Sequence, residues 1–471
     1  MRSHLLHDTT TERYRRSVTE GIERVATRAA TTGRQSPART PEPPAPRLAA
    51  IDLDRPLGDT GLALDELDGI YLRDTLSFRR PRYLAHLHCP VVIPAAVGEA
   101  VLAAVGSPLA TRDPSAGGAL IERRLIDWTA GRLGLGPAAD GVFTGGGTRS
   151  TVQALTLAPA RTGDGDPARL RVLASEAGHF GVRTAAGQLG LGPDAVITVP
   201  GDPDGRMRVL ALARELARCE RAGLLPMAVV ATAGSTDFGS IDPLPEIAAL
   251  CARYGVWLHV DASYSCGLLA SRRNRHRLAG IEHADSVTVD YHKSFFQPVG
   301  SRAVLVRDGS VLRPATPLPG LPAPRGAGRE ARTARRFDAL TLWMTLRVMG
   351  ADAVGDLFDE VCDLATEGWR LLDADPRFEV LMEPSLSTLV FRYLPPVVTG
   401  PADIDRANLH ARKALFDSGD AVLADTKVGA RRYLKLTLLD PATTPADLGA
   451  VLDLISRHAE RYLAERLGPI G

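Results

Sequence analysis

The 471-residue sequence predicts an α/β protein with a mostly parallel β-sheet covered by helices on both faces. The first observation is that short β-branched runs alternate with helical stretches from about residue 113 onward, the pattern of strands joined by crossover helices. The second is composition, because 45% of the residues are hydrophobic and can bury a large core. We therefore expect two or three domains.

The expected elements follow one another in a regular order. Six strands are expected at residues 171–175, 195–200, 227–233, 256–261, 285–290 and 302–308. Helices are expected at residues 207–222, 244–254, 340–349 and 354–373, followed by strands near 387–395 and 431–440 and a final helix at 446–467. In a parallel sheet of this kind, the carboxyl ends of the strands form the ligand site.

The same pattern divides the chain into four segments. Residues 1–48 run into SPARTPEPPAPR, which cannot build a core, so we expect a flexible proline-rich tail. Residues 49–108 are expected to wrap a neighbouring subunit. The large domain that carries the site is expected over 109–365 and a small C-terminal α+β domain over 366–471.

The bulk composition excludes several classes of function. A formal net charge of +1 provides no broad attraction for nucleic acid or an anionic membrane, so a small-molecule substrate is expected. No apolar run is long enough to span a bilayer, and the first residues lack a secretory apolar segment, so we expect a cytoplasmic protein. The five cysteines form no C-x-x-C pair, which indicates neither a metal site nor a disulfide framework.

Two strand ends carry the most informative residues. Asp261 directly follows an apolar strand in HVDASY, and the pair His292–Lys293 follows the next in DSVTVDYHKSFF. A pyridoxal phosphate site needs these groups, a carboxylate that keeps the pyridine nitrogen protonated and an amine that forms an imine. Alternatively, Asp261 caps a turn and Lys293 is a surface cation. That alternative is weakened because the chain has only four lysines.

A glycine-rich turn supplies a candidate phosphate site. In FTGGGTRST, Gly146, Gly147 and Thr148 precede a helix, whose N-terminal amides attract an anion. Such turns are common before helices, so the motif is weak evidence by itself. It matches neither a nucleotide-binding P-loop nor G-x-G-x-x-G, which disfavours ATP or NAD.

Two further positions fit the same site. His179, in SEAGHF, lies between a strand and a helix, where its imidazole could cover the pyridine ring. Ser235 and Thr236 lie just beyond another strand, within reach of the cofactor's phenolic oxygen. A lone histidine is more often a packing residue, so only the combination supports these assignments.

These motifs make the chain recognisable. From about Leu72 to its end it resembles the group II pyridoxal-phosphate decarboxylases, most closely the diaminobutyrate and siderophore lysine decarboxylase branch. The resemblance rests on PRYLAHLHCPVVIP, SEAGHF, TAGSTDFGSIDPL, HVDASY, DYHKSFFQP and YLKLTLLDP. It implies the fold-type I architecture, with a mostly parallel seven-stranded sheet, a small C-terminal domain and an N-terminal helical arm. It also implies a homodimeric amino acid decarboxylase, a carbon–carbon lyase that uses pyridoxal 5'-phosphate.

The resemblance also assigns roles to individual residues. Lys293 would form the imine, Asp261 would pair with the pyridine nitrogen and His179 would stack on the ring. The cofactor-binding set would further include Gly146, Gly147, Thr148, Thr236, Ser263 and His292.

Two departures from the family pattern keep other outcomes open. The relatives' SGGTQS is here Gly145–Ser150, which gains Arg149 and loses a hydroxyl. The family's proton-donating loop tyrosine has no counterpart, since no tyrosine occurs between Tyr291 and Tyr393. Alternatives are therefore decarboxylation coupled to oxidative deamination, carbon–carbon bond formation, a catalytically silent homologue, or an unrelated α/β binding protein. The substrate is not identified by the sequence.

Overall fold

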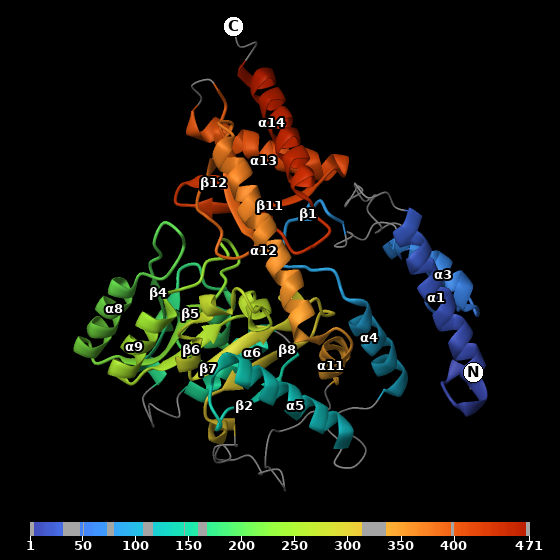
Figure 1. The fold of residues 1–471 in the computed structure, drawn as a ribbon, viewed down its shortest axis with the longest axis horizontal. Coiled ribbons are helices and arrows are strands. Elements are labelled where there is room, and N and C mark those ends of the chain that lie inside the picture. The colour runs from blue at the N-terminus through green and yellow to red at the C-terminus, as the bar shows by residue number, and fades with distance from the viewer. Residues whose placement is uncertain are drawn as a thin grey trace.

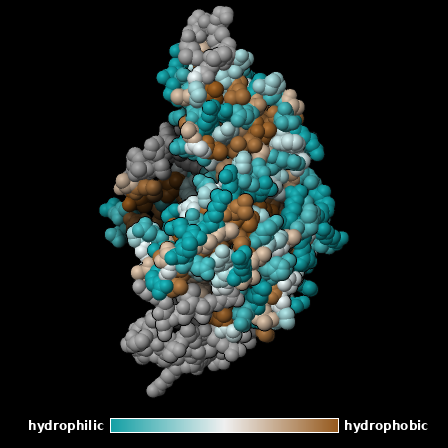
Figure 2. Space-filling view, turned by 90° about the vertical axis from the view of Figure 1, so that its left-hand side faces the viewer, coloured by the Kyte–Doolittle hydropathy of each residue, from teal (hydrophilic) through white to brown (hydrophobic). Residues whose placement is uncertain are grey.

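The computed structural model describes residues 4–31, 48–49, 51–72, 80–106, 116–145, 147–158, 167–312, 336–396 and 400–467. A large α/β domain carries a smaller domain at one end, and N-terminal helices stand beside them (Figure 1). The face on the side of α8 (Val209–Arg221) and α9 (Leu244–Tyr254) is mostly hydrophilic, with hydrophobic residues in small groups (Figure 2).

A seven-stranded sheet forms the centre of the large domain, with the strand order β2-β8-β7-β6-β5-β3-β4. Five neighbouring strands run parallel, whereas β8 is antiparallel to both of its neighbours, β7 and β2. The strands are nearly continuous buried runs because helices cover both faces. They are β2 (Asp140–Phe143), β3 (Leu170–Ser175), β4 (Val196–Val199), β5 (Leu225–Thr232), β6 (Trp257–Asp261), β7 (Ser286–Asp290) and β8 (Arg302–Val306).

Helices with one apolar side pack on this sheet. In α9 (Leu244–Tyr254) the buried residues Leu244, Ile247 and Cys251 recur at helical spacing, and Gly255 ends the helix with a left-handed φ of 64°. The other helices of the domain are α5 (Ala116–Leu133), α6 (Gly147–Leu157), α7 (Gly181–Gln188), α8 (Val209–Arg221), α10 (Tyr291–Ser294) and α11 (Ala339–Val348).

The small domain has its own sheet and core. Its strand order is β1-β11-β12-β10-β9, and the two-residue β1 from the N-terminal region pairs in parallel with β11. The strands are β1 (Tyr83–Leu84), β9 (Phe378–Val380), β10 (Thr388–Tyr393), β11 (Val422–Val428) and β12 (Arg431–Thr437). The helices are α12 (Gly350–Ala374), α13 (Pro401–Ser418) and α14 (Pro445–Leu467).

The described residues of the N-terminal region include the helices α1 (Thr11–Thr31), α3 (Thr60–Leu67) and α4 (Ile93–Val105). The α1–α3 pair lies apart from the body of the molecule (Figure 1). It is joined by ion pairs from Arg24 to Asp65 and from Arg28 to Asp68. Within the expected tail, residues 11–31 form helix α1, whereas the proline-rich stretch lies outside the described residues.

The six strands expected in the large domain and the two in the small domain are confirmed, with ends that differ by at most three residues. The alternation did not reveal β2, which DGVF forms as a partner of β8. Within the described ranges, no helix is long and apolar enough to cross a membrane. All five cysteines are buried and free.

Candidate active site

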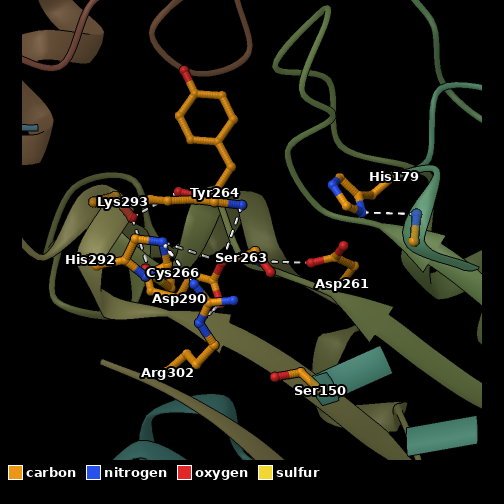
Figure 3. A network of polar contacts seen from close by, with 12 residues as sticks. Ser150, His179, Asp261, Ser263, Tyr264, Cys266, Asp290, His292, Lys293 and Arg302 are labelled. Carbon is orange, nitrogen blue, oxygen red and sulfur yellow. Dashed lines mark hydrogen bonds and ion pairs between the residues drawn. The ribbon is translucent and has the colours of Figure 1, made fainter. Parts of the chain in front are cut away.

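Lys293 projects from the short helix α10, directly after the buried strand β7 (Figure 3). Its amine lies 3.2 Å from the carboxylate of Asp290, and its side chain is 20% exposed. After α10 the chain turns through Phe296, a buried residue with φ of 56°, whose carbonyl accepts a hydrogen bond from Val92. Lys293 is thus both held by a neighbour and accessible.

Asp290 is the centre of a charged cluster at this strand end (Figure 3). Its buried carboxylate lies within 4 Å of three basic side chains, at 3.2 Å from Lys293, 3.6 Å from Arg302 and 3.9 Å from His292. Arg302 Nη2 donates to His292 Nε2 at 3.2 Å. Neither Asp290 nor Arg302 belongs to the site residues predicted from the sequence.

His292 is a neutral imidazole in this cluster. Burial lowers its pKa to about 4, an effect that Asp290 opposes and the Arg302 and Lys293 charges reinforce. Because Arg302 can only donate, His292 Nε2 is assigned as the acceptor, which leaves Nδ1 to donate to the Ser301 carbonyl at 3.4 Å.

Asp261 ends β6, next to the strand that leads to Lys293. It accepts a hydrogen bond from the backbone of Ser263 at 3.0 Å. Burial pushes the pKa of Asp261 upward, but the charge of Lys293 and the hydrogen bonds from Ser263 outweigh this effect and leave the pKa below its ordinary value. The carboxylate therefore stays ionised at neutral pH.

His179 lies on the same side of the site as Asp261 (Figure 3). Its Nδ1 accepts a hydrogen bond from the Gly181 amide at the start of α7, at 3.0 Å, which fixes the ring. Burial lowers the pKa of His179, although Asp261 acts in the opposite direction. The structure thus brings His179, Asp261, Ser263, His292 and Lys293 together as expected.

The other expected residues lie at the edges of this group. Gly147 begins α6 and Thr148 follows it, whereas Gly146 lies outside the described residues. Thr236 is exposed, and its carbonyl accepts a hydrogen bond from Lys435 of the small domain at 3.1 Å. The hydroxyl of Ser235 is buried and lies 3.0 Å from that of Ser240.

Two histidines of the PRYLAHLHCP segment also adjoin the site. Burial lowers the pKa of His88, and the nearby charge of Lys293 lowers it further. Burial likewise lowers the pKa of His86, with contributions from His88 and Lys435. Cys89 anchors the segment by a hydrogen bond to the His292 carbonyl at 3.2 Å.

The residues present fit a pyridoxal phosphate. Asp290 Oδ1 and Arg302 Nε are buried and have no hydrogen-bond partner, although the two atoms lie 3.6 Å apart. Unsatisfied polar atoms are uncommon inside proteins and often mark a functional site. The amine of Lys293, the ionised Asp261 and the N-terminus of α6 are the groups that such a cofactor requires.

The fold is shared with solved decarboxylases. A crystal structure of the glutamate decarboxylase domain of a diaminobutyrate-pyruvate transaminase and L-2,4-diaminobutyrate decarboxylase from Vibrio parahaemolyticus superposes with a TM-score of 0.89. It is 30% identical, and the match covers 98% of each chain. The fold and the site together therefore define a fold-type I, pyridoxal-phosphate-dependent enzyme.

Sequence comparison identifies the family. The pyridoxal-dependent decarboxylase conserved domain matches residues 77–394. The L-2,4-diaminobutyrate decarboxylase of Rhizobium meliloti (strain 1021) is 40% identical over 89% of this chain and 86% of its own length. That of Acinetobacter baumannii is 33% identical over 85% and 84%. The chain belongs to the pyridoxal-dependent decarboxylase family and is an amino acid decarboxylase, a carbon–carbon lyase.

Proposed function

We propose that this enzyme removes the α-carboxylate of an amino acid with a side-chain amine, with L-2,4-diaminobutyrate as the first candidate. The observation that carries the proposal is the placement of Lys293 and Asp261 at the ends of adjacent parallel strands. When bound, pyridoxal phosphate supplies a ring that accepts the electron pair left by the departing carboxylate.

The residues of the site have separable roles in this proposal. Lys293 provides the amine that binds the cofactor covalently. Asp261, ionised because its pKa is low, holds a proton on the pyridine nitrogen. His179, fixed by Gly181, would cover one face of the ring. Thr236 is assigned to the phenolic oxygen.

The preference for a side-chain amine rests on two supports. The relatives above are diaminobutyrate decarboxylases by name. In addition, His86 and His88 have pKa values below the ordinary one, so both imidazoles are neutral at pH 7 and can accept a hydrogen bond from an ammonium group. Neither would attract the carboxylate side chain of a glutamate.

A substrate panel tests this function. The purified enzyme is supplied with diaminobutyrate, ornithine, lysine, glutamate and phenylalanine while carbon dioxide, amine, aldehyde and oxygen uptake are measured. We expect amine from diaminobutyrate at the highest kcat/KM, and none from the Lys293→Ala variant. A preference for glutamate or phenylalanine would contradict the substrate assignment. Aldehyde with oxygen uptake would instead support oxidative deamination, which the missing loop tyrosine keeps open.

We further propose that the enzyme is a cytoplasmic homodimer. The residues Ile93, Val97, Val101 and Val105 recur every four positions on α4, and all are exposed. Such a stripe is typical of a protein interface.

Val101→Asp should yield a monomer in light scattering, whereas Leu210→Asp, at an exposed apolar position on α8, should leave the mass unchanged. A monomeric wild-type enzyme would exclude the dimer.

A further inference from the structure

Arg302 occupies a junction in the sheet that no sequence motif marks. As the first residue of β8, it pairs with Asp290 at the end of β7. Its carbonyl also accepts a hydrogen bond from Thr144, in the turn that leads into α6, at 3.0 Å. Arg302 therefore lies between the strand that leads to Lys293 and the turn that leads to the N-terminus of α6.

The side chain of Arg302 is mostly buried, with 12% exposure, yet its donors are only partly used. Nη2 donates to His292, but Nε is buried and forms no hydrogen bond. Asp290 Oδ1 is 3.6 Å away, close enough for charge attraction but too far for a hydrogen bond. Nε is closed off by the protein, so a further anionic partner would have to bind the part of the guanidinium that remains exposed.

His292 cannot supply the positive charge that such an anion requires. Its low pKa keeps the ring neutral, and its Nε2 lone pair already accepts from Arg302. Lys293 is reserved for the covalent link. Among the described basic residues of this cluster, Arg302 is the cation left to meet a phosphate.

We propose that Arg302 binds the phosphate group of the cofactor, with Asp290 and His292 holding its guanidinium in place. The phosphate would be met by the planar guanidinium fork and by the N-terminal amides of α6. The inference rests on the proposed attachment of the cofactor to Lys293. It adds a binding residue to that site and reduces His292 to a positioning residue.

The test compares two cofactors that differ only in the phosphate. Apoenzyme is titrated with pyridoxal phosphate and with pyridoxal, and binding is followed by visible absorbance and tryptophan fluorescence. Arg302→Met should weaken the affinity for pyridoxal phosphate by about 10- to 100-fold and change the affinity for pyridoxal by less than about threefold. Arg302→Lys keeps the charge but loses the planar fork, so it should weaken the binding of pyridoxal phosphate less than Arg302→Met does.

Controls separate this role from a structural one. Arg307→Met, just beyond the far end of β8, removes a guanidinium that donates to the Ala284 carbonyl and should leave both affinities unchanged. Inorganic phosphate should compete with pyridoxal phosphate for wild-type apoenzyme but not measurably for Arg302→Met. Circular dichroism and thermal melting confirm that each variant is folded.

Three results would overturn the inference. Equal weakening of both cofactors would make Arg302 a purely structural residue. If Arg302→Met bound pyridoxal phosphate with unchanged affinity, Arg302 would not be a phosphate-binding residue. If KM for the amino acid rose in that variant, Arg302 would instead bind the carboxylate of the substrate. Failure of the proposed function is recognised separately, since wild-type enzyme would then bind the cofactor without releasing carbon dioxide.

Discussion

The proposed role of Asp261 requires its negative charge, so it can be tested by a substitution that removes the charge. Replacing it with Asn removes the charge but nearly preserves the shape, so Asp261→Asn should still bind pyridoxal phosphate. We expect kcat to fall at least tenfold, or about 1.4 kcal/mol of lost transition-state stabilisation. Steady-state kinetics with cofactor content measured in parallel would decide this, and a smaller loss would mean that Asp261 does not hold the ring proton.

The buried residue His259 makes the stability of the enzyme depend on pH. It lies on β6, fully buried, with Nδ1 at 2.9 Å from the Ser286 hydroxyl, and burial lowers its pKa from 6.5 to about 4. Between pH 6.5 and 4, His259 is therefore protonated in the unfolded chain but neutral in the folded chain. Its contribution to the free energy of unfolding is complete above pH 6.5 and is lost as the pH falls towards 4, by up to roughly 3 kcal/mol.

Urea unfolding at a series of pH values tests this link. His259→Gln cannot titrate, so its free energy of unfolding should fall less steeply over this pH range than that of the wild type. The exposed His276, changed in the same way, is the control. An unchanged slope in His259→Gln would assign the acid sensitivity to other groups, such as His292.

Single residues also show where sequence reasoning ends. Lys293 could be found because lysine is rare here and because the residue follows a buried strand. Arg302 carries no such signal, since arginines make up most of the 56 basic residues. Its proximity to Asp290 arises only from the antiparallel pairing of β8 with β7. Partners that depend on strand register cannot be derived from residue type alone.

At the scale of elements, the strands that were predicted are those with long β-branched runs. The strand β2 is short and contains Gly141, so DGVF looks like part of a turn. It is a strand because β8 offers a hydrogen-bonding edge, and position 141 is glycine because a side chain there would collide with Leu305 and Val304. The short strands β1 and β9 likewise owe their conformation to their partners.

Close packing behind Lys293 leads to a prediction at the scale of elements. Gly267 lies in the 3-10 turn Ser265–Leu269, where an added Cβ would approach Phe358 of α12 to 2.6 Å and the Ser294 carbonyl of α10 to 2.8 Å. Gly267→Ala should therefore destabilise the enzyme by roughly 1–3 kcal/mol and loosen α10. Thermal melting and cofactor affinity measure the two effects.

Gly187 is the matched position for this test. It lies within α7, and an added Cβ would meet nothing within 4 Å. Gly187→Ala should be neutral or stabilising, by up to about 1 kcal/mol. Equal thermal stability and cofactor affinity of the two variants would show that the packing of α12 against the Ser265–Leu269 turn does not restrict position 267.

At the scale of the whole molecule, the two domains meet on the loop after β5. Lys435 of β12 has a side chain that is 6% exposed, and its amine lies 2.8 Å from Asp237 and 3.1 Å from the Thr236 carbonyl. Beside it, Tyr264 of the large domain contacts the hydroxyls of Ser387 and Thr388 of the small domain. The small domain therefore holds the loop that carries Thr236.

Lys435→Met should release this loop. Because Met keeps the length of the side chain but cannot donate, we expect kcat/KM to fall roughly tenfold, about 1.4 kcal/mol, with cofactor absorbance retained. The exposed Lys427, changed to Met on the neighbouring strand β11, should leave kcat/KM unaffected. If both variants behaved like the wild type, the contact between the domains would have no part in turnover.

The pairing of β1 with β11 has a consequence for the order of folding. Tyr83 and Leu84 form their strand only against Val422 and Leu423, so a segment made early must wait for one made near the end of synthesis. Pairings so distant along the chain close slowly. The segment with His86 and His88 follows β1 directly, so we expect it to reach its final position after the large sheet has formed. During refolding, the helical circular dichroism signal should therefore return before the enzyme regains selectivity among amino acids. In a ribosome-bound chain that lacks β11, the segment with His86 and His88 would not yet be in place.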